Sequence, residues 1–413
     1  MRCLYGFFCC CILTVAGCSS DNGFECGDPN PKLTADGREV IYKRVFCEYV
    51  GWRGSRAVES YLVAYDVETQ ARSRISLRSA SYHVPFDVSS DGQVIVYEQN
   101  TIGPPSNSEL YIYDRGDRST TIVDISEVGT LLSTTPPQAP RISGDGQVVA
   151  FVVQRNGDYG VVTYERATER LEEATIEPKA ASPSLSNDGR FLAYQTGGCH
   201  DCTTSAIWVL DRYTGQRVLT SVNSDGEPAN AESFEPAISG DGRFIVFRSA
   251  ATNLGPPPPT GLGIWPAEVY LHDRETGTTT LLSRDADSGG ASGTTTFDVM
   301  ALMTITSHAI TTDGQVVVYQ SNAANIVPAE SPINGPPNNV YRYDAVADRT
   351  TRVSINSLGE PADGIQLHVS VSDDGLLIAF QADSANLDPR DEDLDLDAYL
   401  HDVESGETRW VNR

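Results

Sequence analysis

The stretch "ISGDGRFIVF" (residues 238–247) decides the fold, because it is one copy of a phrase that recurs along the chain. Each copy has Ser or Thr, a variable residue, Asp and Gly in front of an apolar block. The Asp of the phrase stands at seven positions: Asp36, Asp91, Asp145, Asp188, Asp241, Asp313 and Asp374. Recurrence at intervals of several tens of residues is typical of a repeat architecture. Each Asp-Gly pair is therefore predicted to form a structural turn rather than an acidic active-site loop.

The letters of one copy indicate how a unit folds. Gly supplies the positive φ that a tight hairpin needs, and Asp accepts hydrogen bonds from backbone N–H groups across the turn. Residues 244–247 are all apolar, which is typical of a strand buried on both faces. Antiparallel hairpin sheets usually leave one face in water. Small antiparallel sheets stacked around an axis bury both faces, and this is the arrangement of a β-propeller.

A second phrase, such as "VYLHDRETG" (residues 269–277), follows in each unit and is predicted to be the third strand. Its Asp is expected to accept backbone hydrogen bonds in the turn before a fourth strand. This residue is Asp66, Asp114, Asp211, Asp273, Asp344 or Asp402, and Glu165 takes its place in the third unit. The sequence predicts an all-β protein, a seven-bladed β-propeller of four-stranded antiparallel blades over residues 33–413.

The units resemble the TolB-type, WD40-like propeller repeat. "EPAISGDGRFIVFRSAATNL" (residues 235–254) carries the pattern most clearly, and the resemblance extends over residues 33–413. It implies the fold, but such propellers serve many functions. The extra N-terminal domain of TolB and the hydrolase domain of related peptidases have no counterpart here, so their activities are not carried over. No strand is visibly shared between the first and last units, and either residues 24–31 or blade packing is expected to close the ring.

The N-terminus reads as a lipoprotein leader. Residues 1–17 have the form of a signal peptide, with an apolar run shorter than the roughly 20 residues of a membrane-spanning helix. Val15, Ala16 and Gly17 before Cys18 resemble the bacterial lipobox, which implies lipidation of Cys18; an ordinary signal cut nearby is the alternative. We expect residues 18–32 to tether the propeller to the cell envelope, at the outer membrane or facing the periplasm.

The charge restricts the partners. Lys and Arg number 30 against 56 Asp and Glu, a net charge of −26. Such a surface repels nucleic acid and anionic headgroups. We therefore expect no nucleic-acid partner, membrane contact only through the lipid, and a monomer that binds envelope proteins or peptides.

Four cysteines remain for disulfides once the leader and Cys18 are set aside: Cys26, Cys47, Cys199 and Cys202. An even number in an exported chain favours two disulfides, and local pairing (Cys26 with Cys47, Cys199 with Cys202) is preferred among three possible connectivities. The "CHDC" stretch (residues 199–202) also suits half of a metal site or a redox pair.

Two further regions are candidates for binding. In "DPRDEDLDLDAY" (residues 388–399), alternate positions carry Asp391, Asp393, Asp395 and Asp397, which suits calcium or simply a solvated acidic loop. No other cofactor is expected. The proline-rich insert at residues 254–266 carries Trp265 and is either a stiff binding loop or a connection that tolerates length. His308 and His368 fall beside innermost strands and are placed near the channel.

No hydrolase elbow, zinc-protease helix or phosphate loop is present. The leading hypothesis is a non-catalytic, lipid-anchored protein-binding scaffold. The alternative is a ligand-binding or glycan-binding protein, or an enzyme of hydrolase or lyase type, with its site at the channel mouth. Acids or histidines from several blades that converge on one pocket would favour the alternative.

Overall fold

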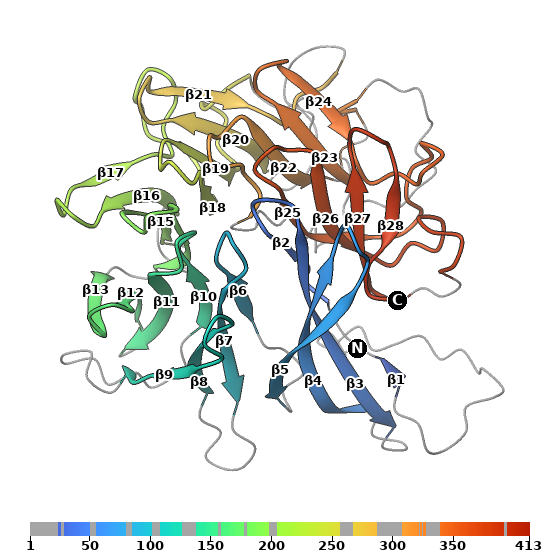
Figure 1. The fold of residues 1–413 in the computed structure, drawn as a ribbon. Helices are drawn as coiled ribbons and strands as arrows, with labels where there is room; N and C mark the ends of the chain where they lie inside the picture. Colours follow the sequence, from blue (N-terminus) through green and yellow to red (C-terminus); the bar gives the residue numbers. More distant parts are fainter. Residues whose placement is uncertain are drawn as a thin grey trace, which may run out of the picture.

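The computed structural model describes residues 24–25, 29–49, 55–79, 85–100, 108–125, 138–155, 158–176, 180–197, 205–256, 267–286, 308–321, 323, 325–327, 339–391 and 395–413. The chain forms seven antiparallel sheets that follow one another around an axis (Figure 1). The predicted all-β, seven-bladed propeller is thereby confirmed. No helix in the described ranges is long and apolar enough to cross a membrane.

The strands of each blade are consecutive in the chain. Blades one and two comprise β1 (Phe24–Glu25), β2 (Lys32–Leu33), β3 (Glu39–Tyr49), β4 (Ser55–Asp66) and β5 (Arg72–Ser79), then β6 (Phe86–Val88), β7 (Val94–Asn100), β8 (Ser108–Asp114) and β9 (Thr120–Val123). Blades three and four comprise β10 (Gln138–Ile142), β11 (Val148–Arg155), β12 (Asp158–Glu165) and β13 (Arg170–Ile176), then β14 (Ala181–Leu185), β15 (Phe191–Thr196), β16 (Ala206–Asp211) and β17 (Arg217–Leu219).

Blades five, six and seven follow in the same order along the chain. They comprise β18 (Ser233–Ile238), β19 (Phe244–Ser249), β20 (Glu268–Asp273) and β21 (Thr278–Leu281); β22 (Val316–Ser321), β23 (Asn339–Asp344) and β24 (Arg349–Arg352); and β25 (Gln366–Val371), β26 (Leu377–Ala382), β27 (Asp397–Asp402) and β28 (Thr408–Trp410). In blade six the innermost strand is reduced to a single bridge between Ile310 and Val317.

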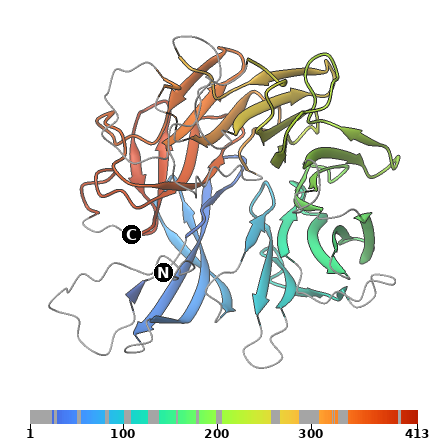
Figure 2. The ribbon, with the colours of Figure 1, turned by 180° about the vertical axis from the view of Figure 1, so that it is seen from behind.

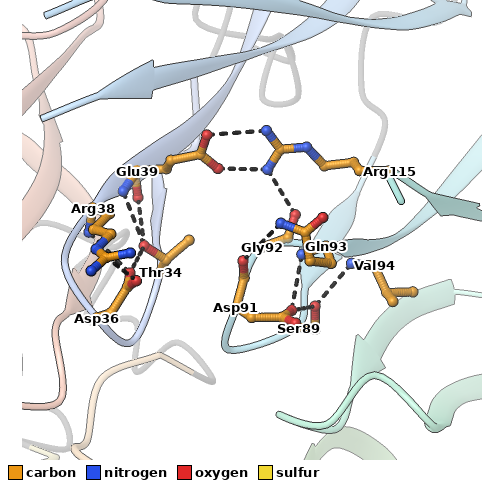
Figure 3. Close-up of polar contacts among 10 residues, drawn as sticks. All are labelled: Thr34, Asp36, Arg38, Glu39, Ser89, Asp91, Gly92, Gln93, Val94 and Arg115. Carbon is orange, nitrogen blue, oxygen red and sulfur yellow. Dashed lines mark hydrogen bonds and ion pairs between the residues drawn. The ribbon is translucent and has the colours of Figure 1, made fainter. Parts of the chain in front are cut away.

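The Asp-Gly turns have the predicted geometry. In blade five the Ser239 hydroxyl donates to Asp241 Oδ1 over 2.5 Å, and the same oxygen accepts from Arg243 N at 2.9 Å. Phe244 N donates to Ser239 Oγ, and Gly242 has a φ of 76°. Figure 3 shows the turns of blades one and two, built around Asp36 and Asp91. In all seven turns the repeated Asp accepts a hydrogen bond from the hydroxyl of the Ser or Thr two residues before it, so the role of this Asp is structural.

The glycine of each turn also lets one blade lie against the one before it. A Cβ added to Gly242 would overlap the ring of Phe191 in blade four, and one on Gly314 would overlap Phe244 in blade five. The same relation closes the ring, since a Cβ on Gly37 of blade one would lie 2.9 Å from Leu377 Cδ1 of blade seven.

The ring closes by packing between blades one and seven, which lie side by side in both views (Figures 1 and 2). Among the described strands none belongs to both terminal blades. Leu33 N instead donates to Ser370 Oγ at 2.9 Å, and Arg72 Nε donates to the Val411 carbonyl at 3.1 Å. Apolar side chains of both blades form one buried cluster. Of the two closures that the sequence left open, the structure has blade packing.

The two faces of the ring hold different connections. The Asp-Gly face holds the turns at residues 34–37, 89–92, 143–146, 186–189, 239–242, 311–314 and 372–375, together with the turns between strands three and four. In six of these latter turns the predicted aspartate accepts from a backbone N–H group: Asp66, Asp114, Asp211, Asp273, Asp344 and Asp402. The opposite face, the loop face, holds the connections between strands two and three and those between blades.

Candidate functional site in the axial channel

One short run from every blade lines the channel. The residue before each repeated Ser or Thr is aliphatic, and together these form an aliphatic ring: Leu33, Val88, Ile142, Leu185, Ile238, Ile310 and Val371. The residue after it contributes to a mouth ring on the Asp-Gly face: Ala35, Ser90, Gly144, Asn187, Gly240, Thr312 and Asp373. These two rings, with Asp87, Arg141 and His308, line a chamber of about 60 Å³.

Hydrogen bonds between neighbouring blades fix the mouth ring. At each step an N–H group of one blade donates to an oxygen of the next blade. The donors and acceptors are Ala35 to Ser90, Ser90 to Gly144, Asp145 to Asn187, Asn187 to Gly240, Asp241 to Thr312, Thr312 to the Asp373 carboxylate, and Asp373 to Ala35. The last step joins blade seven to blade one over 2.7 Å. The circle of bonds is complete, so the mouth is held rigidly.

The side chain of Asn187 lies across this mouth. Its Nδ2 donates to Thr312 Oγ1 in blade six at 2.9 Å, and its Oδ1 accepts from Ser90 Oγ in blade two at 3.3 Å. A Cβ on Gly144 or on Gly240 would collide with this amide, so the glycines of blades three and five make room for it. Asn187 therefore obstructs the channel on the Asp-Gly face.

A second polar contact crosses the channel at the level of the innermost strands. His308 Nε2 of blade six lies 2.6 Å from Asp87 Oδ1 of blade two, and Ile142 N donates to the other carboxylate oxygen at 3.1 Å. The Asp87 side chain is 1% exposed and that of His308 is 18% exposed. Burial opposes ionisation of Asp87, but His308, Lys32 and Arg141 together hold the pKa of this carboxyl well below its usual range.

The ionised carboxylate fixes the hydrogen bonding of the imidazole. Asp87 has no proton to give, so His308 Nε2 must be the donor in this contact. Among the described residues Nδ1 has no hydrogen-bond partner. Arg141 lines the same chamber and donates from Nη1 to the Pro140 carbonyl at 3.1 Å. The chamber is thus lined by an imidazole and a guanidinium.

The chamber is small. About 60 Å³ is space for a few water molecules, whereas pockets for drug-sized ligands begin near about 300 Å³.

The sequence located part of this site. His308 was expected near the channel, and the structure places it there; His368 lies in β25 with a φ of 43° and does not line the chamber. The sequence alone does not mark Asp87 or Arg141 as residues of a site. Both stand two residues before the repeated Ser, where blades five and six have Ala237 and Ala309. A charged residue at that inner position was the signal available.

Most of the other sequence-based candidates lie outside the described residues: Cys18, Cys26, Cys199, Cys202, Trp265 and Asp393. Cys47 is described as backbone only, in β3, where it pairs with Phe24 of β1. This pairing lays the N-terminal segment on blade one. The two predicted disulfides stay predictions.

The remaining aspartates of the calcium hypothesis have protein partners. Asp391 accepts from the Tyr399 hydroxyl, and Asp397 accepts from Asn412 Nδ2 at 2.7 Å. Asp395 is exposed. Within the described residues no group of three or more His, Cys, Asp or Glu is arranged to hold a metal ion. Calcium binding by this loop stays a hypothesis.

Comparison with known proteins matches no family model and no curated protein. Solved structures do match. The β-propeller domain of the Trilobed protease from Pyrococcus furiosus, described as having an open velcro topology, is 12% identical over 96% of this chain and 97% of that one, with a TM-score of 0.58. Oligogalacturonate lyase from Vibrio parahaemolyticus is 13% identical over 94% and 93%, with a TM-score of 0.54.

The likeness is one of fold. TolB from Acinetobacter baumannii is also similar, at 16% identity over 90% of this chain and 82% of that one. Its TM-score is 0.44, too low to support a conclusion. At such identities neither the protease nor the lyase assigns an activity to this chain.

Proposed function

We propose that the protein is a non-catalytic, lipid-anchored binding scaffold of the cell envelope, which engages a protein or peptide partner through its loop face. The contrast between the two ends of the channel carries the proposal. Asn187 and the circle of hydrogen bonds obstruct the channel on the Asp-Gly face. The loop face holds connections of very unequal length, from residues 156–157 in blade three to residues 250–267 in blade five.

A rigid ring suits a binding scaffold. The circle of hydrogen bonds joins all seven blades on the Asp-Gly face, so little order remains to be imposed on the ring when a partner binds at the opposite face. The insert at residues 254–266 combines four consecutive prolines with Trp265. Proline stiffens a segment before binding, and tryptophan is enriched among residues that dominate interface energies.

The lipid anchor is part of the same proposal. The net charge of −26 opposes attachment to anionic headgroups, so membrane contact would depend on acylated Cys18. Fractionation tests this directly: Cys18→Ala should move the protein from the membrane fraction to the soluble fraction. Unchanged membrane association of the variant would contradict the anchor.

The partner is tested by crosslinking in intact cells followed by mass spectrometry. One variant replaces residues 257–264 with Gly and Ser at equal length and carries Trp265→Ala. The matched control is Tyr213→Ser, which removes an aromatic side chain that is 71% exposed on the Asp-Gly face. The crosslinked partner should disappear from the insert variant and persist in the control. Loss in the control alone, or persistence in both, would overturn the assignment to the loop face.

A second function has one specific observation in its favour. Asp87, Arg141, His308 and Asp373 come from four different blades and line one chamber. Such convergence is typical of a ligand site. The second candidate is therefore binding of a small molecule in this chamber, whose volume is about 60 Å³.

A further inference from the structure

In blades five and seven a serine hydroxyl caps the outermost strand. Ser224 Oγ accepts from Thr279 N at 3.0 Å and donates to the Thr279 carbonyl at 3.3 Å. Ser357 makes the same two bonds with Thr408 of blade seven, at 2.9 and 3.2 Å. Each serine belongs to the connection that leaves the preceding blade. It satisfies two main-chain groups that the sheet itself leaves without a partner.

The connection after blade five has alanine at this position. Each of three connections begins with a serine whose hydroxyl accepts from an N–H group of strand three: Ser221 from Ile207, Ser283 from Val269 and Ser354 from Val340. The capping residues Ser224 and Ser357 follow three positions later. The third position after Ser283 is Ala286. Alanine has no hydroxyl, so it cannot cap the outermost strand of blade six in this way.

The outer edge of β24 is therefore left open at this point. β24 is the outermost strand of blade six (Figure 1), and Thr350 has the position of Thr279 in blade five. Val353 N donates to the Val340 carbonyl. Hydrogen bonding alternates along a ladder, so the N–H and C=O groups of Thr350 and Arg352 point away from β23. None of these four groups has a hydrogen-bond partner among the described residues.

A groove of about 620 Å³ lies beside this edge. Its walls are β24, the connection after blade five with Ala286, and the hairpin at residues 355–361. Ile326, Val327 and Ile355 give it apolar surface. Outward-facing main-chain groups beside apolar pockets are what strand addition requires, in which an extended peptide pairs with the edge of a sheet.

The charges along the groove favour an acidic peptide. Arg284, Arg349 and Arg352 line it, together with Asp285 and Asp348. Arg284 is paired with Asp348 through both terminal guanidinium nitrogens, and Asp285 accepts from Asn325 Nδ2. Arg349 and Arg352 make no ion pair within the described part of the chain, where Arg352 Nε is buried without a hydrogen-bond partner. Both can therefore receive a carboxylate.

A second copy of the chain fits this edge less well than an acidic peptide. Each copy would bring the same two arginines to the shared edge, and like charges on neighbouring strands are destabilising. We propose that β24 of blade six receives an extended acidic segment of a partner protein, which pairs with the main chain of Thr350 and Arg352. Its carboxylates lie beside Arg349 and Arg352.

This groove goes beyond the loop-face proposal, because the groove belongs to blade six and the insert at residues 254–266 to blade five. Its test uses only purified protein and peptides, without membrane or crosslinking. Either proposal can therefore fail without the other.

The probe is the capped heptapeptide Thr-Glu-Val-Thr-Glu-Val-Thr, titrated into the full chain and followed by NMR at constant sodium chloride. With its central Thr opposite Thr350, the two Glu face Arg349 and Arg352 in either strand direction. One control peptide has Lys in place of both Glu, and the other has Pro in place of the central Thr, which removes an N–H group.

We expect both control peptides to bind at least about tenfold more weakly than the probe, the equivalent of a charge-assisted or paired hydrogen bond. Attraction to the net charge of −26 would favour the Lys peptide instead. No binding of the probe, or equal affinity for either control peptide, would overturn the proposal.

Ala286→Ser restores the hydroxyl that caps the other two blades. It should lower the affinity for the probe at least about fivefold, because the added hydroxyl competes for Thr350. The matched control is Ala347→Ser, at an exposed position in the turn between β23 and β24, where the affinity should not change. Unchanged affinity in Ala286→Ser would overturn the proposal. The comparison of the three peptides uses wild-type protein, so it stands even where Ala286→Ser does not fold.

Two other occupants of the edge have distinct outcomes. Sedimentation should show a monomer, and a dimer that Ala286→Ser dissociates would assign the edge to a second copy. Binding of the probe that appears only after residues 287–307 are replaced by a Gly-Ser linker would assign the edge to the chain itself. Either result would overturn the proposal.

Discussion

The Asp-Gly face and the loop face are built from the same strands, yet they differ in almost every other respect. On the Asp-Gly face seven turns repeat one pattern of contacts, from Thr34 and Asp36 to Ser372 and Asp374. On the loop face, the connection between strands two and three varies widely in length: it comprises residues 156–157 in blade three and residues 250–267 in blade five. The face with repeated sequence holds the ring together, and the face with unrepeated sequence is free to vary.

The two faces differ because their connections make contacts with different parts of the molecule. An Asp-Gly turn packs against the preceding blade and joins the circle of hydrogen bonds, as Gly242 does with Phe191. In Figure 3, Arg115 of blade two reaches both Glu39 of blade one and the Gly92 carbonyl of its own turn. A longer loop between strands two and three leaves the ladder intact, since the closure entropy of a loop grows only slowly with length.

The largest expected effect comes from a glycine of the Asp-Gly face. Gly242→Ala places a Cβ on a residue with φ of 76° and against the Phe191 ring, whereas Gly215→Ala has a similar φ of 72° with nothing within 4 Å. We expect a loss of about 3 kcal/mol of unfolding free energy for Gly242→Ala and about 1 kcal/mol for Gly215→Ala. Urea unfolding measures both. Equal losses would contradict the close approach of the blades.

The next effect is a pH dependence of the blades themselves. Burial lowers the pKa of His401 to about 4, and it also lowers the pKa of His272, at the same position in blade five. Each imidazole nitrogen Nδ1 lies 2.9 Å from a threonine hydroxyl. Between pH 6.5 and 4 the unfolded chain binds more protons than the folded one, so stability falls as pH falls through this window.

From pH 7 to pH 5 we expect His401 alone to remove about 2 kcal/mol of unfolding free energy. Urea unfolding at the two pH values measures it, and His401→Gln should show a smaller difference between them. A pH difference of the same size in wild type and His401→Gln would show that His401 is not the group responsible.

The smallest effect concerns the hydroxyl of the repeated phrase. Ser239→Ala removes the donor to Asp241 and the acceptor of Phe244 N, and we expect a loss of about 1 kcal/mol. Ser405→Ala, in an exposed turn of blade seven, should cost less than about 0.5 kcal/mol. Thermal and urea unfolding of both variants compares them. A larger loss for Ser405→Ala would reverse the ranking of the two kinds of turn.

Much of the fold followed from local sequence. Ser239, Asp241 and Gly242 act within a few residues of one another, so their spacing alone predicts the turn and its hydrogen bonds. The apolar block after the turn predicts the strand that is covered on both sides, and Ile245, Val246 and Phe247 are fully buried. Counting the copies then gives the number of blades.

The site followed less well. Asp87 and His308 are separated by 221 positions, and they meet only because blades two and six face each other across the channel. Asn187 can obstruct the channel mouth only because Gly144 of blade three and Gly240 of blade five leave room for its amide. No local pattern brings these residues together, and each residue alone is ordinary at its position.

The sequence by itself determined the turns, the strands, the number of blades and the face on which each connection emerges, because these depend on contacts within one repeat. Tertiary structure alone decided how the ring closes, what obstructs the channel and which charges meet in the chamber. Those features depend on contacts between blades that are far apart in the sequence, such as Asp373 with Ala35 and His308 with Asp87. The geometry of the closed ring sets these contacts.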